Sequence, residues 1–333
     1  MKLIINGSAV QNSSLGVRRY FEGVLPHLEW PEGYSITHVH PWRSLDRILE
    51  LTWPGSRNAV LWSPAHRGPL RALHHIVTVH DCINVEYVYR RDWRRPALKW
   101  ASTQLLNNAA AVVAISQATK AALVRNYNLD PVRIIVIPSS CLVSIQGASV
   151  DVNRGERQAP DASVASRQYV LMVTNFLPHK NTLQACTALA KSAAARKGMV
   201  LRVVGSLDPA AIDICRRANI ELRVESQVSE STLRQRYEGC RFLLSPSLDE
   251  GHNLPIAEAL SFGANVLCSD IPAHREFYGD RVAFFDPLDV DAIAHAIDLF
   301  WMHEGNWFPG VLAPTRSFAD VAADYRALFS QVR

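Results

Sequence analysis

The sequence predicts an α/β protein with two doubly wound parallel sheets, and two observations support this fold class. Short apolar runs, each about the length of one buried strand, alternate with segments of helical periodicity. The alternation stops at Ser144–Ser166, which is rich in small and polar residues and lacks aromatic ones, and then begins again. We therefore expect one Rossmann-like domain over residues 1–150 and a second over residues 151–316.

The first half contains six apolar runs that we expect to be strands. Strands of a parallel sheet are buried on both faces, so they read as continuous apolar runs rather than as alternating ones. A loop with Ser13-Ser14-Leu15-Gly16 follows the first run, and a helix is expected to open at Val17. The expected strands are Lys2–Asn6, Ile36–Val39, Ala59–Trp62, Ile76–Val79, Ala111–Ile115 and Ile134–Ile137, and the other helices are Pro96–Asn108 and Gln117–Tyr127.

The second half repeats the pattern after the predicted linker. Its last segment, residues 317–333, contains an amphipathic helix over Phe318–Phe329, with apolar residues at helical spacing. The expected strands are Tyr169–Val173, Val200–Val204 and Arg241–Leu244, and the expected helices are Asn181–Ala195, Glu230–Glu238 and Leu254–Phe262.

Composition excludes several classes of protein. Hydrophobic residues make up 48% of the chain and charged residues 20%, as in an ordinary globular protein. The chain has no run of 18 apolar residues, and its first residues turn polar too early for a secretory signal. The six cysteines are scattered without a Cys-x-x-Cys pair. We therefore expect a cytoplasmic protein with reduced thiols.

The positive charge is concentrated in the first half. Residues 1–150 hold sixteen Lys and Arg against nine Asp and Glu, whereas the remaining residues hold nineteen against twenty-two. Residues 90–100 combine four Arg, one Lys and two Trp, which suits either an anionic membrane face or a solvated helix start. Nucleic acid is not an expected partner, because no recognised binding motif accompanies the charge.

The stretch Ser245–Glu258 contains the strongest candidate site. Pro255 lies near the start of a predicted helix, so Glu250 lies on the loop before that helix and Glu258 about one turn inside it. Free backbone N–H groups and the positive end of the helix dipole can bind a phosphate there. The two carboxylates could then hold hydroxyl groups of the same ligand. The alternative is a capped surface loop with two solvated acids.

Polar residues also follow several of the predicted strands. In doubly wound sheets, ligands bind at the carboxyl ends of the strands. His80 comes directly after Ile76–Val79, Ser116 after Ala111–Ile115, and Lys180 after Tyr169–Val173 and before a helix. A cation at the position of Lys180 could hold a diphosphate. The alternative for His80 is a purely structural hydrogen-bonding role.

The motif Glu250–Glu258, with its continuation to Gly263 and the segments Asn265–Asp270 and Arg275-Glu276, resembles the donor-site signature of glycosyltransferase family 4. The resemblance covers nearly the whole chain and is densest from Tyr169 to Pro287. It implies the GT-B fold, with two Rossmann-like domains facing across a cleft and a final helix that crosses back to the first domain. It also implies a retaining hexosyltransferase without a metal or other cofactor.

The resemblance assigns roles to individual residues. It implies that Lys180 neutralises the donor phosphates, that Glu250 holds sugar hydroxyls and that Glu258 holds the ribose. His80 would support the positive charge that develops on the sugar. No enzyme nucleophile is required, because the donor phosphate acts as the base in the mechanism proposed for the family. The remaining donor-binding positions would be Gly16, Ser116, Asn175, Gln227, Val228, Gly251, His252, Asn253 and Leu254.

The chain departs from the family pattern at two places. Family members usually have an aromatic residue and then Gly after Glu-Gly, where this chain has His252-Asn253. Asn tolerates left-handed backbone angles better than most residues, so the turn can be kept. Many members also have an Arg where this chain has Asn175. Neutralisation of the phosphates would then depend more heavily on Lys180 and on the helix start.

These features predict transfer of a hexose, mannose or similar, from a nucleotide-diphospho-sugar in surface polysaccharide synthesis. GDP-mannose is the favoured donor, with a UDP- or dTDP-sugar as the alternatives. A glycan or a polyprenyl-diphosphate-linked molecule would be the acceptor, and the protein would work on the inner face of the cytoplasmic membrane. The alternatives are a GT-B epimerase and an inactive sugar-nucleotide binder. A nicotinamide-dependent enzyme is disfavoured, because no Gly-x-Gly-x-x-Gly follows any predicted strand.

Overall fold

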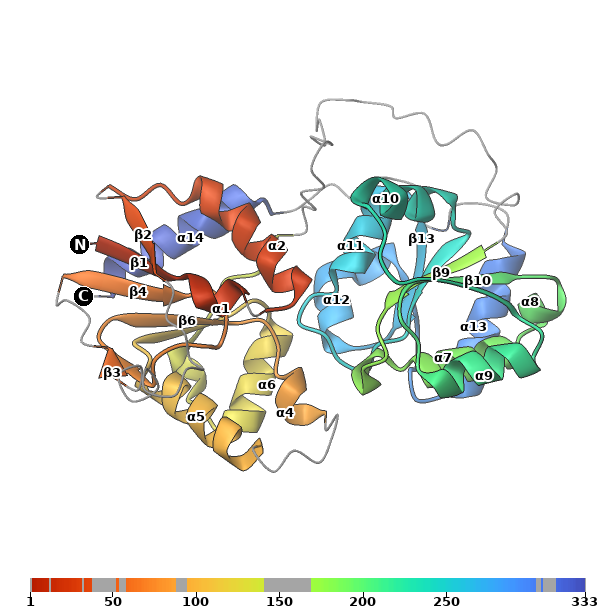
Figure 1. The fold of residues 1–333 in the computed structure, drawn as a ribbon, viewed down its shortest axis with the longest axis horizontal. Coiled ribbons are helices and arrows are strands. Elements are labelled where there is room, and N and C mark those ends of the chain that lie inside the picture. The colour runs from red at the N-terminus through yellow and green to blue at the C-terminus, as the bar shows by residue number, and fades with distance from the viewer. Residues whose placement is uncertain are drawn as a thin grey trace. The chain divides into compact units, whose positions relative to one another are not determined.

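The protein, seen here in a computed structural model, is built from two compact units (Figure 1). One unit comprises Met1–Leu142 and Pro314–Arg333, and the other Val143–Ala313. The structure describes residues 2–11, 13–31, 33–37, 52–53, 58–87, 95–140, 169–303, 307 and 316–332. Each unit has a six-stranded, wholly parallel sheet, so the predicted α/β fold with two Rossmann-like halves is confirmed. The predicted linker Ser144–Ser166 lies outside the described residues.

The sheet of the first unit has the strand order β2-β1-β4-β6-β7-β8. The four inner strands are largely or fully buried, as the apolar pattern predicts, whereas the edge strands β2 and β8 are more exposed. The strands are β1 Lys2–Asn6, β2 Tyr34–Thr37, β4 Ala59–Ser63, β6 His75–Val79, β7 Ala111–Ala114 and β8 Ile134–Val136, and a separate two-residue pair is formed by β3 Thr52–Trp53 and β5 Arg71–Ala72. The helices are α1 Gly7–Gln11, α2 Leu15–Val24, α4 Ile83–Glu86, α5 Arg95–Asn108, α6 Gln117–Tyr127 and α14 Phe318–Gln331.

The last helix, α14, belongs to the first unit although it follows the second unit in the sequence. Its N-terminus is fixed by a capping box, in which Ser317 and Asp320 exchange side-chain and backbone hydrogen bonds. Its apolar face packs against α2, and its buried Tyr325 hydroxyl lies 2.7 Å from Thr78 Oγ1 and 3.1 Å from Tyr20 Oη. Figure 1 shows this blue helix among the red and orange elements of the first unit.

The sheet of the second unit has the strand order β11-β10-β9-β12-β13-β14. This order reverses direction between β9 and β12, which makes these two neighbouring strands the switch point of a Rossmann-like sheet. The strands are β9 Tyr169–Thr174, β10 Val200–Gly205, β11 Glu221–Glu225, β12 Phe242–Ser245, β13 Asn265–Ser269 and β14 Ala283–Phe285. The helices are α7 Thr182–Lys191, α8 Ala193–Arg196, α9 Pro209–Arg217, α10 Glu230–Gly239, α11 Leu254–Ser261, α12 Pro272–Tyr278 and α13 Val290–Met302.

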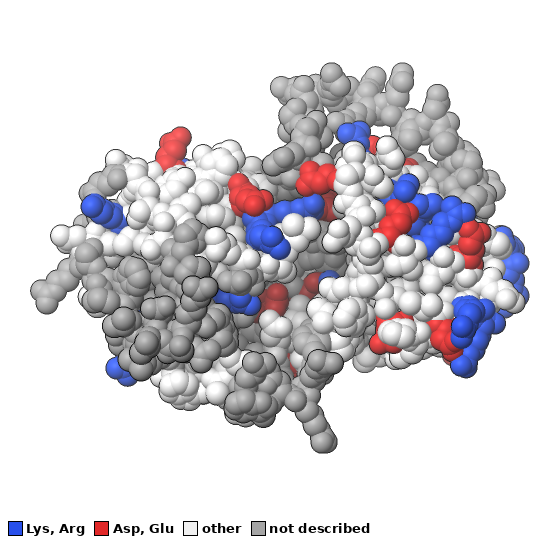
Figure 2. Space-filling model, in the orientation of Figure 1, with Lys and Arg blue, Asp and Glu red and all other residues white. Residues whose placement is uncertain are grey.

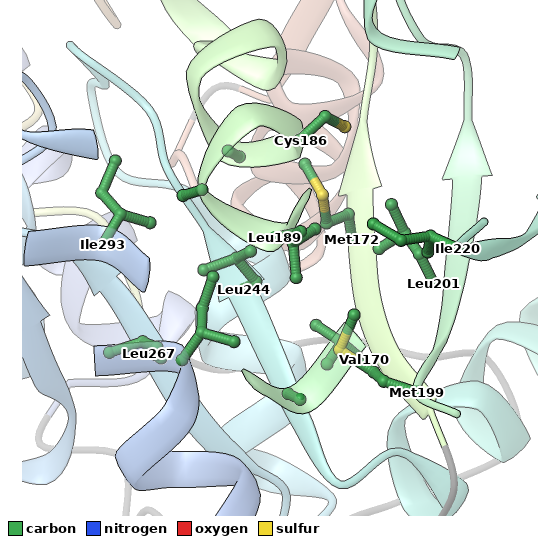
Figure 3. Close-up of a cluster of buried hydrophobic side chains, with 14 of the residues drawn as sticks. Val170, Met172, Cys186, Leu189, Met199, Leu201, Ile220, Leu244, Leu267 and Ile293 are labelled. Atoms are coloured by element: carbon green, nitrogen blue, oxygen red, sulfur yellow. The ribbon is translucent and has the colours of Figure 1, made fainter. Parts of the chain in front are cut away.

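The core of the second unit lies between the sheet and the helices α7, α9 and α13. Figure 3 shows strand side chains such as Met172 and Leu244 meeting Leu189 of α7. Each fully buried side chain of this size contributes about 1.5–3 kcal/mol to stability. This packing fixes β9, β10, β12 and β13 relative to one another, and the loops that follow these strands inherit their positions.

The predicted single helix Asn181–Ala195 is wrong, because the structure breaks it at Ser192. The hydroxyl of Ser192 accepts a hydrogen bond from the backbone N–H of Ala195 and caps a new short helix, α8. The carboxylate of Asp298 accepts hydrogen bonds from the backbone N–H groups of Ala193 and Ala194 at 3.0 and 2.9 Å. A distant acidic residue therefore stabilises the break, and the local sequence pattern does not reveal it.

Charged side chains of both signs are interspersed on the face of the second unit that Figure 2 shows. Several of them form ion pairs, for example Arg202 with Glu225 at 2.6 Å and Arg234 with Glu238 at 2.7 Å.

In the part of the chain that the structure describes, no helix is long and apolar enough to cross a membrane.

Gly205 gives a testable constraint at the end of β10. Its φ is +118°, and a Cβ added there would lie 1.9 Å from the carbonyl oxygen of Thr174 at the end of β9. We expect Gly205→Ala to destabilise the protein by more than the about 1–2 kcal/mol of an L-residue in this backbone region alone, because the backbone must also shift. Thermal or urea unfolding measures this loss.

Gly198 provides the matched control. Its φ is also positive, at +77°, but nothing lies within 4 Å of an added Cβ. Gly198→Ala should therefore show only the conformational cost. Equal losses of stability in the two variants would contradict the close approach of β9 and β10 at Gly205.

Candidate active site

A cluster of hydrogen-bonded, largely buried polar side chains lies at the switch point of the second sheet. β9 and β12 are hydrogen-bonded neighbours, so the loops after Thr174 and Ser245 start at the same edge of the sheet. A backbone hydrogen bond of 2.7 Å from Leu248 N to His179 O joins these two loops directly. Residues that are about 70 positions apart in the sequence are thereby placed side by side.

Lys180 reaches this site from the loop after β9. It ends the 3₁₀ turn Pro178–Lys180, and Asn181 then adopts left-handed angles, with φ 53°, before α7 begins. The side chain of Asn181 donates to the carbonyl of Pro287 at 2.9 Å, which fixes this turn from the other side. The ammonium group of Lys180 lies 2.5 Å from Glu250 Oε1.

Glu250 is a buried carboxylate with two donors on the same oxygen. Lys180 Nζ and Ser247 Oγ donate to Oε1 at 2.5 and 2.7 Å, and the side chain is only 9% exposed. Burial raises the pKa of Glu250, but the charge and hydrogen bond of Lys180 and the hydroxyl of Ser247 outweigh burial, so the pKa lies below its ordinary value. Glu250 is therefore ionised at neutral pH and forms a true ion pair.

His179 lies beside this pair and is neutral. Burial, followed by the positive charge of Lys180, lowers the pKa of His179 to about 4, although Glu250 acts in the opposite direction. The positive charge at the mouth of β9 therefore resides on Lys180 rather than on the neighbouring imidazole.

The loop between β12 and α11 ends at Asn253, which adopts left-handed angles of φ 75° and ψ 68° immediately before Leu254. Its side-chain amide donates to Ser245 Oγ at 2.8 Å and lies 2.8 Å from His274 Nε2. The hydroxyl of Tyr278 donates to the carbonyl oxygens of His252 and Asn253 at 3.1 and 2.9 Å. As predicted, Asn253 adopts the left-handed backbone angles that the turn requires, so the turn is kept.

His252 occupies the position at which the family has an aromatic residue, and its ring is packed like one. It lies 4.1 Å, centroid to centroid, from Phe277 and stacks at 6.0 Å on Tyr278 with an interplanar angle of 6°. Its side chain is buried, as is Gly251 before it. His252 therefore anchors the loop against α12.

Glu258 lies one turn inside α11 and is buried. Its Oε2 accepts a hydrogen bond of 2.7 Å from the hydroxyl of Tyr237 on α10. The ring of Tyr237 stacks on Phe262 at 6.0 Å, which fixes the phenol. Glu258 is consequently oriented by a neighbouring helix and does not extend into solvent.

The other predicted positions of the second unit lie on separate loops. Asn175 directly follows β9, and its side-chain Oδ1 accepts a hydrogen bond of 3.1 Å from the backbone N–H of Leu177. Gln227 is exposed and Val228 is half-buried between β11 and α10, two strands away from β9 in the sheet order. The structure therefore brings Lys180, Glu250 and Asn253 together, and places Gln227 and Val228 at the outer side of the same edge.

In the first unit, His80 follows β6 as predicted. Its Nε2 donates to the carbonyl of Pro64 at 2.8 Å, and the ring of Tyr20 meets it edge-on at 4.9 Å. Burial lowers the pKa of His80 to about 4, so the imidazole is neutral with its proton on Nε2. This geometry also satisfies the structural alternative for His80, in which the ring mainly holds β4 and β6 together.

Ser116 and His80 are connected through Thr119. Ser116 is the N-cap of α6 and accepts from Thr119 N at 3.0 Å, while Thr119 Oγ1 donates to the carbonyl of His80 at 3.0 Å.

Gly16 is predicted in a loop, but the structure places it in the first turn of α2, one helical turn before Tyr20. The short helix α1 takes up the residues after β1 instead, so the predicted loop position of Gly16 is wrong.

The sequence does not single out several residues that complete the site, namely Ser247, Ser269, His274 and Tyr237. The one signal that could have found any of them is the polar end of the apolar run at Ser269, since polar residues at the carboxyl ends of buried strands often face a ligand. His274 and Tyr237 lie on helices whose packing is not visible in the sequence. Within the described ranges, no group of three or more His, Cys, Asp or Glu could hold a metal ion.

Two family models match the chain one after the other. The model "Glycosyltransferase Family 4" matches residues 29–140, and "Glycosyl transferases group 1" matches residues 154–305. The first match lies within the first unit and the second match within the second unit. The predicted donor-site residues Lys180, Glu250 and Glu258 all fall within the second match.

Curated relatives are similar over part of their length. The chain is 27% identical over 212 residues to an O-antigen chain mannosyltransferase B of Escherichia coli, which covers 61% of this chain and 54% of the relative. It is 24% identical over 225 residues to the O-antigen chain mannosyltransferase RfbU of Salmonella typhimurium, which covers 66% of this chain and 59% of the relative. The chain thus matches a little over half the length of each.

Solved structures share the whole fold at low identity. The lipopolysaccharide outer core galactosyltransferase WaaB has a TM-score of 0.62 at 16% identity, with 99% of this chain and all of that chain covered. Anabaena Alr3699/HepE, solved with UDP and glucose, has a TM-score of 0.61 at 14% identity, with 100% and 95% covered. The solved structures and the two Rossmann-like sheets show the GT-B fold, and the two consecutive family matches show that the chain belongs to glycosyltransferase family 4.

Proposed function

We propose that the protein transfers a hexose from a nucleotide-diphospho-sugar to a glycan or a lipid-linked acceptor in surface polysaccharide synthesis, with retention of configuration. Mannose is the favoured sugar, because the curated relatives are named O-antigen mannosyltransferases, and GDP is the nucleotide expected to carry it. The observation that supports this proposal best is the Lys180–Glu250 ion pair at the switch point of the second sheet.

In the proposed reaction the enzyme acts mainly by stabilising the leaving nucleoside diphosphate. Lys180 binds its phosphate oxygens and stabilises the negative charge that grows as the bond to the anomeric carbon breaks. The N–H groups at the start of α11 add to this stabilisation, since the positive end of a helix dipole favours an anion. A cation and a helix start can together do the work that a divalent metal does elsewhere, so the proposed mechanism uses no metal.

The carboxylates hold the two ends of the donor. Glu250 accepts hydrogen bonds from sugar hydroxyls, and Glu258, oriented by Tyr237, does the same for the ribose. The acceptor hydroxyl attacks from the side of the departing phosphate, which takes the proton, so no enzyme nucleophile is needed. His80 supports the positive charge on the sugar with its unprotonated Nδ1, which a neutral ring with Nε2–H provides.

The acceptor side of the proposal rests on charge. The first half of the chain carries sixteen Lys and Arg against nine Asp and Glu. Four of the Arg, at positions 90, 91, 94 and 95, lie outside the residues whose side chains the structure describes. The adjoining first turns of α5 expose Leu98 and Trp100, at 44% and 59%, on either side of Lys99. Apolar and cationic groups in one turn suit an anionic lipid surface.

The first test is turnover against a panel of nucleotide sugars, with and without EDTA. We expect GDP-mannose to be used and EDTA to leave the rate largely unchanged. Lys180→Ala should lower turnover a hundredfold or more, which corresponds to about 3 kcal/mol of lost leaving-group stabilisation. Lys191→Ala is the matched control, because Lys191 lies on α7 in an exposed pair with Asp291.

A near-normal kcat/KM in Lys180→Ala would remove Lys180 from the mechanism. Loss of activity in EDTA that manganese or magnesium restores would contradict the metal-free reaction. Absence of transfer with every sugar nucleotide in the panel, while nucleoside diphosphates still bind, would favour an inactive binder.

The ion pair makes a second prediction about nucleotide affinity. Because Glu250 holds Lys180 before the donor arrives, a diphosphate must compete with a carboxylate for the same ammonium group. We expect Glu250→Gln to bind the free nucleoside diphosphate several-fold more tightly, since the competing charge is gone, but to turn over at least a hundredfold more slowly. Calorimetry of diphosphate binding and steady-state kinetics measure the two effects.

Asp291→Asn is the control for this experiment. It removes the carboxylate of the Lys191–Asp291 pair, which is also a Lys–carboxylate pair but is exposed to solvent, at 52% and 80%. Its diphosphate affinity should match that of the unaltered protein. Weaker diphosphate binding in Glu250→Gln would show that the carboxylate helps rather than opposes the binding of phosphate.

A further prediction concerns the cationic segment of the first half, residues 90–100. Replacing Arg90, Arg91, Arg94 and Arg95 by Gln should weaken binding to anionic vesicles and raise the KM for a lipid-linked acceptor. Each cation near an anionic surface contributes roughly 1 kcal/mol, and salt weakens the effect. Donor hydrolysis without acceptor should stay unchanged. Co-sedimentation with vesicles at low salt measures the binding.

A second set of four Gln replacements gives the same change of charge elsewhere. The exposed Arg196, Arg216, Arg217 and Arg223 of the second unit serve this purpose. Their removal should leave vesicle binding nearly intact. If the unaltered protein does not bind anionic vesicles at low salt, the acceptor is a soluble molecule.

A further inference from the structure

The start of α11 depends on an unusual backbone conformation at Asn253. With φ 75° and ψ 68°, this residue lies in the left-handed region, which costs an L-residue roughly 1–2 kcal/mol relative to ordinary helical angles. The cost is lower for Asn than for most residues but higher than for Gly, which adopts positive φ freely. Something in the surrounding structure must therefore hold Asn253 in place.

Three groups hold Asn253, and they come from two different elements. Its side-chain Nδ2 lies 2.8 Å from Ser245 Oγ at the end of β12 and 2.8 Å from His274 Nε2 on α12. Its backbone carbonyl accepts from the hydroxyl of Tyr278, also on α12, at 2.9 Å. Both side-chain contacts are buried, so each contributes more than an exposed hydrogen bond would.

The hydrogen bonds fix the protonation of His274. Its Nδ1 lies 2.8 Å from the carbonyl oxygen of Ser269, which can only accept, so Nδ1 carries the proton. Nε2 is then the acceptor for the Asn253 amide. The side chain is wholly buried, and this burial lowers the pKa of His274 to about 4, in keeping with a neutral ring at physiological pH.

The contacts of His274 also extend toward Glu250. The hydroxyl of Ser269 lies 3.3 Å from His274 Nδ1 and donates to the carbonyl of Ser247. Ser247 Oγ in turn donates to Glu250 Oε1 at 2.7 Å. His274 thus lies at the point where the end of β13, the start of α11 and the carboxylate loop are joined.

We propose that His274 is a positioning residue for the donor site, which holds Asn253 in its left-handed conformation and so keeps the first N–H groups of α11 aimed at the donor diphosphate. The inference rests on the proposed function of this site. It also explains why a chain with Asn at this position can keep a turn that Gly would otherwise provide: the clamp from His274 and Ser245 replaces the freedom of Gly.

A double-mutant cycle between His274 and Asn253 tests the inference. His274→Leu should lower kcat/KM for the donor at least tenfold, through a higher donor KM, and leave the acceptor KM unchanged. In an Asn253→Gly background the same His274→Leu change should cost less than threefold, because Gly holds the positive φ without a clamp. His274→Gln, which can still offer an acceptor to the Asn253 amide, should recover part of the loss.

Ile293→Val separates positioning from simple loss of stability. It removes one buried methyl group from the core of the second unit, on α13, and should lower the melting temperature without raising the donor KM. If His274→Leu causes an equal loss in the unaltered background and in the Asn253→Gly background, the inference is overturned. An acceptor KM that rises with the donor KM would overturn it as well. Absence of sugar transfer by the unaltered protein would instead contradict the proposed function itself.

Discussion

A buried ion pair at the switch point of the second sheet determines how the site is built. Lys180 and Glu250 come from loops after neighbouring strands, and a backbone hydrogen bond from Leu248 to His179 joins these two loops. Burying two charges costs several kcal/mol, which their attraction and the added hydrogen bond of Ser247 offset. A pair of this kind is weak evidence for stability, and in the proposed function the donor diphosphate takes the place of Glu250 at Lys180.

The sequence predicts the parallel sheets well because buried strands are continuous apolar runs. Lys2–Asn6, Gln117–Tyr127 and Val200–Val204 agree with β1, α6 and β10 within a residue. Lys180, Glu250 and Asn253 are likewise predictable, since strand-end positions are visible in the pattern. What the pattern could not show depends on contacts between distant residues. Asp298 accepts hydrogen bonds at the break after Ser192, and His274 contacts Asn253 in the turn before α11.

The two units use buried neutral histidines in a similar way. His80, after β6, donates to the carbonyl of Pro64 after β4, whereas His274 joins Ser269 at the end of β13 to Asn253 in the loop after β12. Burial lowers the pKa of both histidines to about 4. At neutral pH such rings act as fixed hydrogen-bonding groups without a charge. The charges at the switch point of the second sheet therefore reside on Lys180 and Glu250.

The return of α14 to the first unit affects the order in which the chain can fold during synthesis. The core of the first unit contains Leu3, Ile5 and Trp62 together with Val321, Tyr325 and Phe329 of α14. A ribosome must therefore finish the entire second unit before the first sheet receives its last covering helix. In the part of the chain that the structure describes, the core of the second unit lies within residues 170–301, so this core can be complete while the first unit is still open. Domains usually fold in the order of synthesis, and here the earlier one must wait for the later one.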